Sequence, residues 1–297
     1  MYNIDKTLKM KKIILTILII GFAAAGFFYF KPNSISEPSP DDSAGFRMDI
    51  TSEVTGLKPE TPQEISFRIL DKQDQVYTDF AIAHEKIMHF IVVRKDLTNF
   101  HHLHPEFNSK SGEFNTTVIF PTDGPYRIYA DFTPATDNPQ RLAVSAFSDL
   151  EVGKVDSYKP EATVPDENYF HRNGPFNISY FLGNTPVKAG SQLDYGLTVE
   201  STTNDEQVQL EPYLGSRGHS VIIKEGSLEY LHTHSTSMDM TDMEDYPAGE
   251  HAGHHMSEPD TVDFSAVFPE SGTYRMFNQF KVNQEVFTDI YTLRVEQ

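Results

Sequence analysis

Two groups of three histidines in this sequence share one spacing. Both read His-x12-His-x-His, and the members are His89, His102 and His104, and then His219, His232 and His234. Imidazole nitrogen is a common ligand of zinc and also suits copper. Three such nitrogens converging on one point, with a coordination position left open, would form a metal site. Metal binding is therefore the first chemistry that the spacing indicates.

A short hairpin would bring the second group together. Residues 225–228 (EGSL) have glycine in the first central position, which a two-residue type II′ turn favours. With that turn, His219 lies directly across from His234, and opposed residues have Cβ atoms about 4.5–5.5 Å apart. His232 lies two positions along the strand from His234 and therefore on the same face. We expect all three imidazoles on one patch of this hairpin.

The first group fits the same geometry with a longer turn. If residues 95–98 form a four-residue loop, a common hairpin length, His89 lies across from His104. His102 then shares their face, because alternate residues of a strand point to the same side. A register shift of one residue would turn these side chains to the opposite face. The predicted cluster therefore depends on the register.

A structural role for the histidines is the alternative to metal binding. Their strand face also carries Ile91, Val93, Val221 and Ile223, so we expect it to face the sandwich core. Buried histidines are usually hydrogen-bonded, and a duplication would copy structural residues as readily as ligands. Clustered imidazoles, however, repel one another when protonated and lack partners when neutral unless an ion bridges them. Both interpretations stay open on the sequence alone.

Three further histidines are weaker candidates. His84 and His101 flank the first group, but the matching positions of the second copy are Leu214 and Leu231. For both we therefore expect a surface or packing role. His171 stands alone beside an Arg-Asn-Gly sequence, and we interpret it as a loop residue.

A Met- and His-rich segment follows the second group. His104 and Pro121 are 17 positions apart, whereas His234 and Pro269 are 35 apart, so the second copy carries an insertion near 237–257. Its candidate ligands are thioethers and imidazoles, namely Met238, Met240, Met243, His251, His254, His255 and Met256. This ligand set suits Cu(I) and Cu(II) better than zinc, and we expect it to capture copper. The alternative is a solvated acidic loop.

A second motif shows that most of the chain is duplicated. The sequence FPTDGPYR at 120–127 recurs as FPESGTYR at 268–275. Around both copies, short runs of β-branched and aromatic residues are interrupted by Pro and Gly about every 8–12 residues, as in β-sandwiches and barrels. We predict an all-β protein with two tandem immunoglobulin-like or cupredoxin-like β-sandwiches, over 46–155 and 170–297, with a linker over 156–169.

Composition excludes several classes of function. The 297 residues contain no Cys, which excludes disulfides, thiolate zinc sites, iron–sulfur clusters and the His/Cys copper centre of electron-transfer proteins. Lys and Arg total 24 against 43 Asp and Glu, a net charge of -19. Nucleic-acid affinity comes largely from Lys and Arg, so we expect no nucleic-acid partner. No nucleophile motif, phosphate-binding loop or dinucleotide fingerprint is present, and we expect no enzyme.

The N-terminal residues predict a membrane anchor. Residues 1–12 form a lysine-rich leader, 13–30 contain no charged residue, and 31–45 are rich in Pro, Ser and Asp. About 18 apolar residues are just enough to cross a bilayer. Lysines before the span place the N-terminus in the cytoplasm, so we predict a single-pass protein of the cell membrane with both sandwiches outside. Cleavage as a signal peptide is the alternative, with Ala23-Ala24-Ala25 as the site.

The sequence around the histidines resembles a group of bacterial envelope proteins. The resemblance is carried by residues 84–105, from HEKIMHFIVVRKDL to FHHLHP, and by YLGSRGH at 213–219 with YLHTH at 230–234. It indicates tandem β-sandwich proteins similar to the YtkA-like group, which are often suspected of copper or heavy-metal handling. The resemblance implies an anchored or secreted envelope protein and draws attention to the same six histidines.

Together these observations predict an extracytoplasmic protein that binds copper, or less favourably zinc, for buffering or delivery. Its expected partners are the metal ion and, through the N-terminal helix, the lipid bilayer, while an envelope protein partner is left open. The alternative from another class is an envelope interaction module with structural histidines. A metal-dependent hydrolase is a weaker alternative, since no general base stands out beside the histidines.

Overall fold

The computed structural model describes residues 45–135, 143–203, 207–235, 258 and 260–297. These residues form eighteen β-strands and one short 3-10 helix, η1 (Val155–Ser157). The contact pattern places them all in one compact unit. The predicted all-β fold class is confirmed for this part of the chain. The leader, the predicted span over 13–30 and nearly all of the predicted stalk over 31–45 lie outside the described residues.

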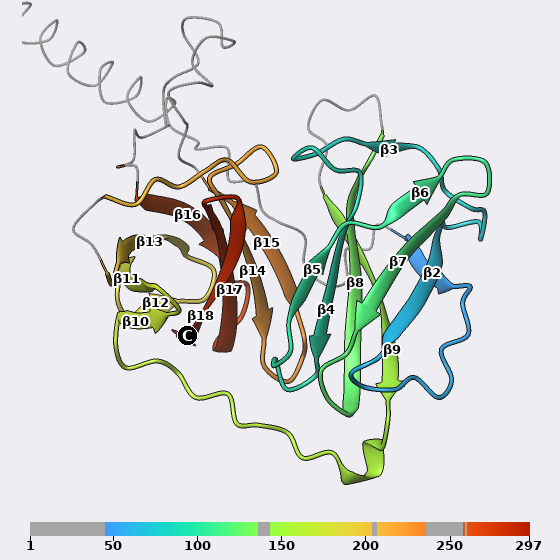
Figure 1. The fold of residues 1–297 in the computed structure, drawn as a ribbon, viewed down its shortest axis with the longest axis horizontal. Coiled ribbons are helices and arrows are strands. Elements are labelled where there is room, and N and C mark those ends of the chain that lie inside the picture. Colours follow the sequence, from blue (N-terminus) through green and yellow to red (C-terminus); the bar gives the residue numbers. More distant parts are fainter. Residues whose placement is uncertain (1–44, 136–142, 204–206, 236–257, 259) are drawn as a thin grey trace, which may run out of the picture. The chain divides into compact units, whose positions relative to one another are not determined.

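Two sheets are built from the first half of the chain (Figure 1). One sheet has the order β1 (Arg47–Ile50), β2 (Pro62–Leu70), β7 (Glu113–Ile119) and β6 (Glu106–Asn108). The other has the order β3 (Phe80–Ala81), β8 (Gly124–Pro134), β4 (His89–Arg94) and β5 (His101–Leu103), with β9 (Val144–Val152) also paired to β8. We call this half the first repeat.

The second half repeats this arrangement after η1 and a strand-free connection. One sheet has the order β10 (Phe170–Asn173), β11 (Phe176–Leu182), β13 (Gln192–Ser201) and β16 (Thr261–Val267). The other has the order β12 (Val187–Lys188), β18 (Glu285–Glu296), β17 (Gly272–Val282), β14 (Gly218–Lys224) and β15 (Tyr230–His234). Here β14, β15 and β17 take the places of β4, β5 and β8. We call this half the second repeat.

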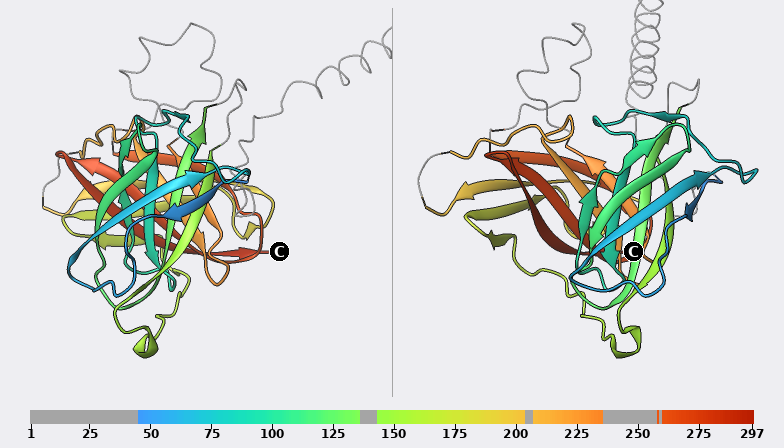
Figure 2. Two further views of the ribbon diagram at one scale, coloured as in Figure 1. Left: turned by 90° about the vertical axis from the view of Figure 1, so that its right-hand side faces the viewer. Right: turned by 45° about the vertical axis from the view of Figure 1, so that its right-hand side comes forward.

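Figure 2 shows the sheets of the two repeats in turned views. Each repeat has its own hydrophobic core between its two sheets. In the first repeat, Phe67 of β2 stacks on Phe114 of β7 and on Phe90 of β4, with ring centroids 5.3 and 5.0 Å apart. In the second, the hydroxyl of Tyr195 on β13 donates to Ser220 Oγ on β14 at 2.7 Å. These contacts join the two layers, so the predicted β-sandwich architecture is confirmed.

The duplicated FPxxGxYR motif forms a tyrosine corner in each repeat. The hydroxyl of Tyr126 donates to the carbonyl of Thr122 at 2.9 Å, and that of Tyr274 donates to the carbonyl of Glu270 at 2.8 Å. Such a bond fixes the turn that leads into a sandwich strand. The glycine of the second motif, Gly272, has φ +150°, and a Cβ there would meet Lys224 at 2.8 Å. The tyrosine and the glycine of the repeated motif therefore have structural roles.

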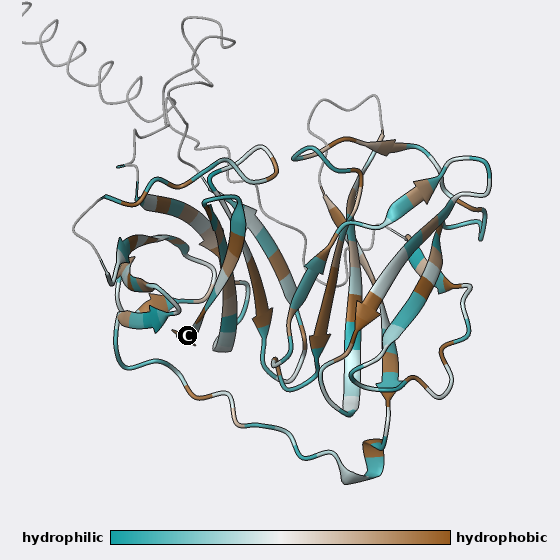
Figure 3. Ribbon diagram, viewed as in Figure 1, coloured by the Kyte–Doolittle hydropathy of each residue, from teal (hydrophilic) through white to brown (hydrophobic). Residues whose placement is uncertain are grey.

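The histidine-bearing strands meet in a third core, which lies between the repeats. Ile91, Val93 and Tyr129 of the first repeat pack with Val221 and Tyr230 of the second, and all are buried. The rings of Tyr129 and Tyr230 stack with centroids 4.7 Å apart. Figure 3 shows that β4 and β14 are predominantly hydrophobic strands. The expectation that this face would point into its own sandwich core is wrong, because it packs against the other repeat.

Both predicted hairpin registers are confirmed, whereas the turns differ from the prediction. The type II′ turn over 225–228 is wrong, because the Leu228 amide donates to the carbonyl of Lys224 and closes a four-residue loop. Leu228 has φ +59°, which permits this longer loop. In the first repeat, the Arg94 amide donates to the carbonyl of Thr98. A regular four-residue loop over 95–98 would instead pair Arg94 with Asn99. The strand pairing itself is unaffected in both.

Candidate metal centre

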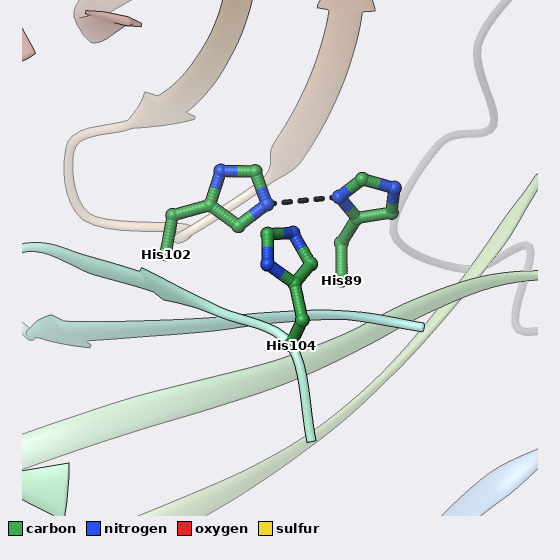
Figure 4. Close-up of side chains that lie close together, drawn as sticks. All are labelled: His89, His102 and His104. Carbon is green, nitrogen blue, oxygen red and sulfur yellow. Dashed lines mark hydrogen bonds between the residues drawn. The ribbon is translucent and has the colours of Figure 1, made fainter. Parts of the chain in front are cut away.

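The first triplet lies at one end of the β4–β5 hairpin. His89 begins β4, His102 lies in β5, and His104 follows the end of β5. Phe90 pairs with Leu103, which is the predicted register. One nitrogen of each imidazole lies within 4.8 Å of the others. Figure 4 shows the three rings converging, with the contact between His89 and His102 drawn as a dashed line.

The second triplet occupies the matching place on the β14–β15 hairpin. His219 pairs directly with His234, and His232 lies two positions along β15. One nitrogen of each ring again lies within 4.8 Å of the others. His219 and His232 are buried, with exposed fractions of 0% and 2%. The sequence thus predicted correctly which histidines come together within each repeat.

The two triplets also lie beside each other. The ring centroid of His89 is 5.1 Å from that of His232 and 5.9 Å from that of His219. The centroid of His102 lies 5.7 Å from that of His232. These distances resemble those within a triplet, where His89 and His102 are 5.1 Å apart. The six imidazoles therefore form one cluster between the repeats, which we call the histidine cluster.

The middle histidine of each triplet is held by the other repeat. Nδ1 of His102 lies 2.6 Å from Oε1 of Gln279 on β17. Nδ1 of His232 lies 2.6 Å from Oδ2 of Asp131 on β8. An amide or carboxylate oxygen accepts hydrogen bonds, so each Nδ1 carries the proton and each Nε2 keeps its lone pair.

A third hydrogen bond fixes the protonation of His219. Its Nε2 donates to the backbone carbonyl of Tyr213 at 2.9 Å, which leaves a lone pair on Nδ1. This Nδ1 lies 3.4 Å from Nε2 of His232, whose lone pair is also free. When Asp131 is ionised, two lone pairs therefore face each other in a buried position. A cation between the two nitrogens would turn this repulsive contact into an attractive one.

Other imidazole nitrogens in the cluster have no partner. Nε2 of His89, His104 and His234 is buried and makes no hydrogen bond within the described structure. Buried polar atoms are nearly always satisfied, so each exception needs an explanation. Nitrogens that are shielded from water yet unpaired are suited to bind an ion. Because Nε2 of His101 outside the cluster is also unpaired, the observation supports ligation only together with the convergence of the three rings in each triplet.

Burial keeps the imidazoles neutral. It lowers the pKa of His102 to about 4, and burial together with the positive charge that His102 would carry lowers the pKa of His104 to about 3. The pKa values of His219, His232 and His234 are lowered well below the ordinary value for the same reason. Metal ligation needs neutral imidazole. At neutral pH the cluster therefore offers its lone pairs to a cation.

Asp131 adds a buried carboxyl group to this neutral cluster. The residue is 5% exposed, and its Oδ2 also accepts a hydrogen bond from the Tyr230 hydroxyl at 3.0 Å. Within the described part of the chain, its ion-pair partner is His232, and no Lys or Arg pairs with it. Burial raises the pKa of Asp131. A buried carboxylate without a cationic neighbour creates a strong local preference for a positive ion.

The donor set of the second triplet fits a transition-metal ion, whereas in the first triplet Nδ1 of His89 and Nε2 of His102 share a hydrogen bond at 2.9 Å. Zinc–nitrogen bonds of about 2.0–2.1 Å in a tetrahedral site place two nitrogens about 3.3 Å apart. The Nδ1 of His219 and Nε2 of His232 have close to that separation, at 3.4 Å. The carboxylate behind His232 matches the usual environment of a ligating histidine. The residues therefore fit the metal that their spacing suggested.

The remaining histidines lie around or away from the cluster. His84 stacks on His234, with centroids 3.5 Å apart and planes 17° from parallel. Nitrogen lone pairs lie in the ring plane, so two stacked rings do not direct them to one ion, and His84 has the packing role expected. His101 adjoins His102 in β5 and therefore points to the opposite face. His171 is not a loop residue, because it lies in β10 and contacts Asp289 at 3.0 Å.

Part of the predicted site lies outside the described residues. This part is the insertion near 237–257, with the candidate ligands Met238, Met240, Met243, His251, His254, His255 and Met256. A copper-binding role for these side chains stays a prediction. The strands on either side of the insertion are β15, which ends at His234, and β16, which begins at Thr261.

Sequence reasoning missed Asp131 and Gln279. A signal for them was present in the duplicated motif, because both residues stand eleven positions after its phenylalanine. They also pair with the first histidine of their own triplet, Asp131 with His89 and Gln279 with His219. A polar residue in such an apolar strand at the same place in both repeats could have been recognised as functional.

The family comparison follows the duplication closely. Residues 42–145 and 177–297 match the profile described as "Domain of unknown function (DUF8832)". These matches cover more than half of the chain and include all six histidines of the cluster. The chain belongs to the DUF8832 family. No curated protein sequence matches this DUF8832 protein significantly.

Several solved structures resemble this DUF8832 protein at low identity. The Escherichia coli adhesin FdeC is 7% identical with a TM-score of 0.24, covering 85% of this chain and 64% of its own. The Yersinia pseudotuberculosis adhesin InvE is 7% identical with a TM-score of 0.23, covering 85% and 60%. Salmonella α2-macroglobulin reacted with methylamine is 8% identical with a TM-score of 0.24, covering 90% and 15%. The chain spans less than two thirds of these structures, and TM-scores this low carry no argument about function.

In the described part of this DUF8832 protein, no helix has the length and apolar character needed to cross a bilayer. The anchor predicted over 13–30 lies outside the described residues and stays a prediction.

Proposed function

We propose that this protein binds transition-metal ions through its two histidine triplets and buffers or delivers them outside the cytoplasm. The observation that carries the proposal is the contact between Nδ1 of His219 and Nε2 of His232 at 3.4 Å. The other nitrogen of each ring holds its proton in a bond to Tyr213 or Asp131. A metal ion between the two nitrogens would satisfy both lone pairs, and this supports the proposal.

Copper is the favoured metal and zinc the alternative. Imidazole alone serves both metals, so the six clustered histidines do not distinguish them. The preference for copper comes from the Met- and His-rich insertion near 237–257, whose thioethers suit Cu(I). The resemblance to YtkA-like envelope proteins supports the same choice.

The proposed location is the outer face of the cell membrane. It rests on the lysine-rich leader and the uncharged run over 13–30, which together indicate an anchor with an external C-terminal part. External protease should remove the two sandwiches from intact cells, or from spheroplasts where an outer membrane is present. Protection of both sandwiches while a known external marker is degraded would contradict this orientation.

An interaction module with structural histidines is the second candidate. The observation in its favour is that the bonds of His102 to Gln279 and of His232 to Asp131 join the two repeats, as structural hydrogen bonds would. Two of the similar solved structures are adhesins, but their TM-scores are too low to support the candidate. A purely structural role leaves the unpaired Nε2 atoms of His89, His104 and His234 unexplained. We therefore prefer a binding protein for metal ions, without enzymatic activity.

The test is metal titration of the purified full chain. Cu(II) and Zn(II) are added near neutral pH to the wild type, to the double variant His102→Gln/His104→Gln and to His101→Gln. The double variant should lose one equivalent of metal, while His101→Gln should keep both, because that side chain points away from the cluster. If the wild type binds neither metal, the histidines are structural.

A further inference from the structure

The two triplets are held by different chemical groups, although their positions are equivalent. Asp131 and Gln279 stand at the same place in the two repeats, each paired with the first histidine of its own triplet. Each reaches across to Nδ1 of the middle histidine of the other triplet, at 2.6 Å in both contacts. The second triplet is therefore supported by a carboxylate and the first by an amide.

This difference affects how strongly the middle histidine binds a cation. A carboxylate that accepts a hydrogen bond from the Nδ1–H group makes the opposite Nε2 more basic and adds a negative charge near the ion. An amide oxygen orients the ring in the same way but contributes no net charge. Asp131 is 5% exposed and Gln279 is 6% exposed, so water screens the difference weakly.

The other contacts of the two supporting groups show that both are fixed in position. Asp131 Oδ2 also accepts a hydrogen bond from Tyr230 at 3.0 Å. Gln279 Nε2 donates to Thr288 Oγ1 at 3.1 Å, which orients Oε1 toward His102. Because both middle rings are oriented and only one support is charged, charge is the main difference between the two supports.

We propose that the histidine cluster is a two-ion centre with unequal sites, in which the triplet of His219, His232 and His234 fills first and the triplet of His89, His102 and His104 is the weaker, exchangeable site. This inference rests on the proposed metal binding. Asp131 and Gln279 act as positioning residues, each supplied by the repeat that does not carry the histidine it orients. The weaker site is the one that releases its ion to an acceptor.

The test isolates each site in the full chain and then changes only its support. His102→Gln/His104→Gln leaves the second triplet, and His232→Gln/His234→Gln leaves the first. Zn(II) is the probe, measured by competition with a chromophoric chelator, because thioethers bind zinc poorly and the signal then reports imidazole sites. The second triplet should bind Zn(II) more tightly than the first.

Asp131→Asn is then added to both backgrounds. Asparagine keeps an oxygen that can accept from His232 and removes only the charge. Affinity should fall about 10- to 100-fold where the second triplet remains. It should fall by a smaller factor where the first remains, because the Asp131 charge also acts on His89 and His102 but neither of them is hydrogen-bonded to it. Gln279→Glu should strengthen the first triplet and leave the second unchanged. If either residue had only a structural role, its substitution would change the Zn(II) affinity of both triplets by a similar factor.

The outcomes separate this inference from the proposed function. If the wild type binds no Zn(II) or Cu(II), metal binding itself is wrong. If it binds two ions with equal affinity, and Asp131→Asn and Gln279→Glu change neither site, metal binding stands and the unequal centre is overturned. Thermal unfolding of each metal-free variant shows whether it is folded, and a folded variant with the expected unequal change at the two triplets supports the inference.

Discussion

Oδ2 of Asp131 accepts a hydrogen bond from Nδ1 of His232 at 2.6 Å, although the two residues stand 101 positions apart and in different repeats. The equivalent contact joins Gln279 to His102. Because of this exchange, the middle histidine of each triplet is oriented by a residue of the other repeat. Each sandwich therefore supplies the residue that orients the middle histidine of the other sandwich.

Replacing Asp131 by Asn should stabilise the metal-free protein at neutral pH. Burial raises the folded-state pKa of Asp131 above its unfolded value, so the folded state binds the proton more tightly. Stability is present below the unfolded pKa and is lost as the pH rises from there through the folded pKa, so the carboxyl group is a penalty above that window. Removing that charge should raise the free energy of unfolding by about 1 kcal/mol or more.

Urea denaturation in the presence of a chelator measures this change. Asp149→Asn, at a half-exposed carboxylate on β9 that pairs with Arg127 and Lys95, is the control and should not stabilise the protein. A clear loss of stability in Asp131→Asn would show that the buried carboxylate stabilises the metal-free fold.

The metal-free protein should be unusually sensitive to mild acid. The folded-state pKa values of His102 and His104 are lowered to about 4 and about 3 by burial, so between these values and about 6.5 only the unfolded chain takes up protons. Stability is present above the unfolded pKa and falls as the pH drops. Each such histidine contributes a slope of about 1.4 kcal/mol per pH unit.

Denaturant midpoints between pH 7.5 and pH 4.5 test this slope. The double variant His102→Gln/His104→Gln should show a shallower loss, because two of the groups that take up protons on unfolding are gone. Equal pH dependence in the wild type and the double variant would contradict the prediction.

The sequence was sufficient for the strand registers of both hairpins. A glycine-containing turn and alternation along a strand predicted that His219 faces His234, and the pairing confirms it. The turn itself was wrong, because Leu228 adopts a positive φ and extends the loop. The register survived because Val221 and Ile223 pack between the repeats while Ile222 packs in the sandwich core, and a shift of one residue would exchange the two faces.

The sequence could not reveal what the histidine face packs against. Alternation shows that Ile91 and Val221 share a buried face, but a core within one sandwich and a core between two repeats give the same pattern. For the same reason, the contacts of His102 to Gln279 and of His232 to Asp131 were not predictable from periodicity. These contacts depend on how the two repeats pack together, and the periodicity of a single strand contains no information about that packing.

Removing the hydroxyl of Tyr129 should weaken the contact between the repeats. This hydroxyl donates to the backbone carbonyl of Leu228 at 2.8 Å, and both residues are buried. Tyr129→Phe keeps the stacking on Tyr230 but leaves the carbonyl without this donor. The free energy of unfolding should fall by about 1–3 kcal/mol.

Tyr169→Phe is the matched control, because Tyr169 is exposed and should tolerate the change. Both variants are compared by urea denaturation of the metal-free full chain. If Tyr129→Phe unfolds at the same urea concentration as the wild type, the hydrogen bond does not stabilise the interface.

The insertion between His234 and Pro269 should give the protein its preference for Cu(I). Thioethers bind Cu(I) well and zinc poorly, and the insertion supplies four of them, Met238, Met240, Met243 and Met256. Deleting residues 237–257 should therefore lower Cu(I) affinity, measured by competition against a Cu(I) chelator, and leave Zn(II) binding at the two triplets unchanged.

Replacing the four methionines by leucine separates the two kinds of ligand in the insertion. Leucine has nearly the volume of methionine but no sulfur, so the variant should lose Cu(I) affinity as the deletion does. A loss in the deletion alone would assign the effect to His251, His254 and His255. Unchanged Cu(I) affinity and stoichiometry in both variants would show that the segment is a solvated acidic loop, and the choice of copper over zinc would lose its support.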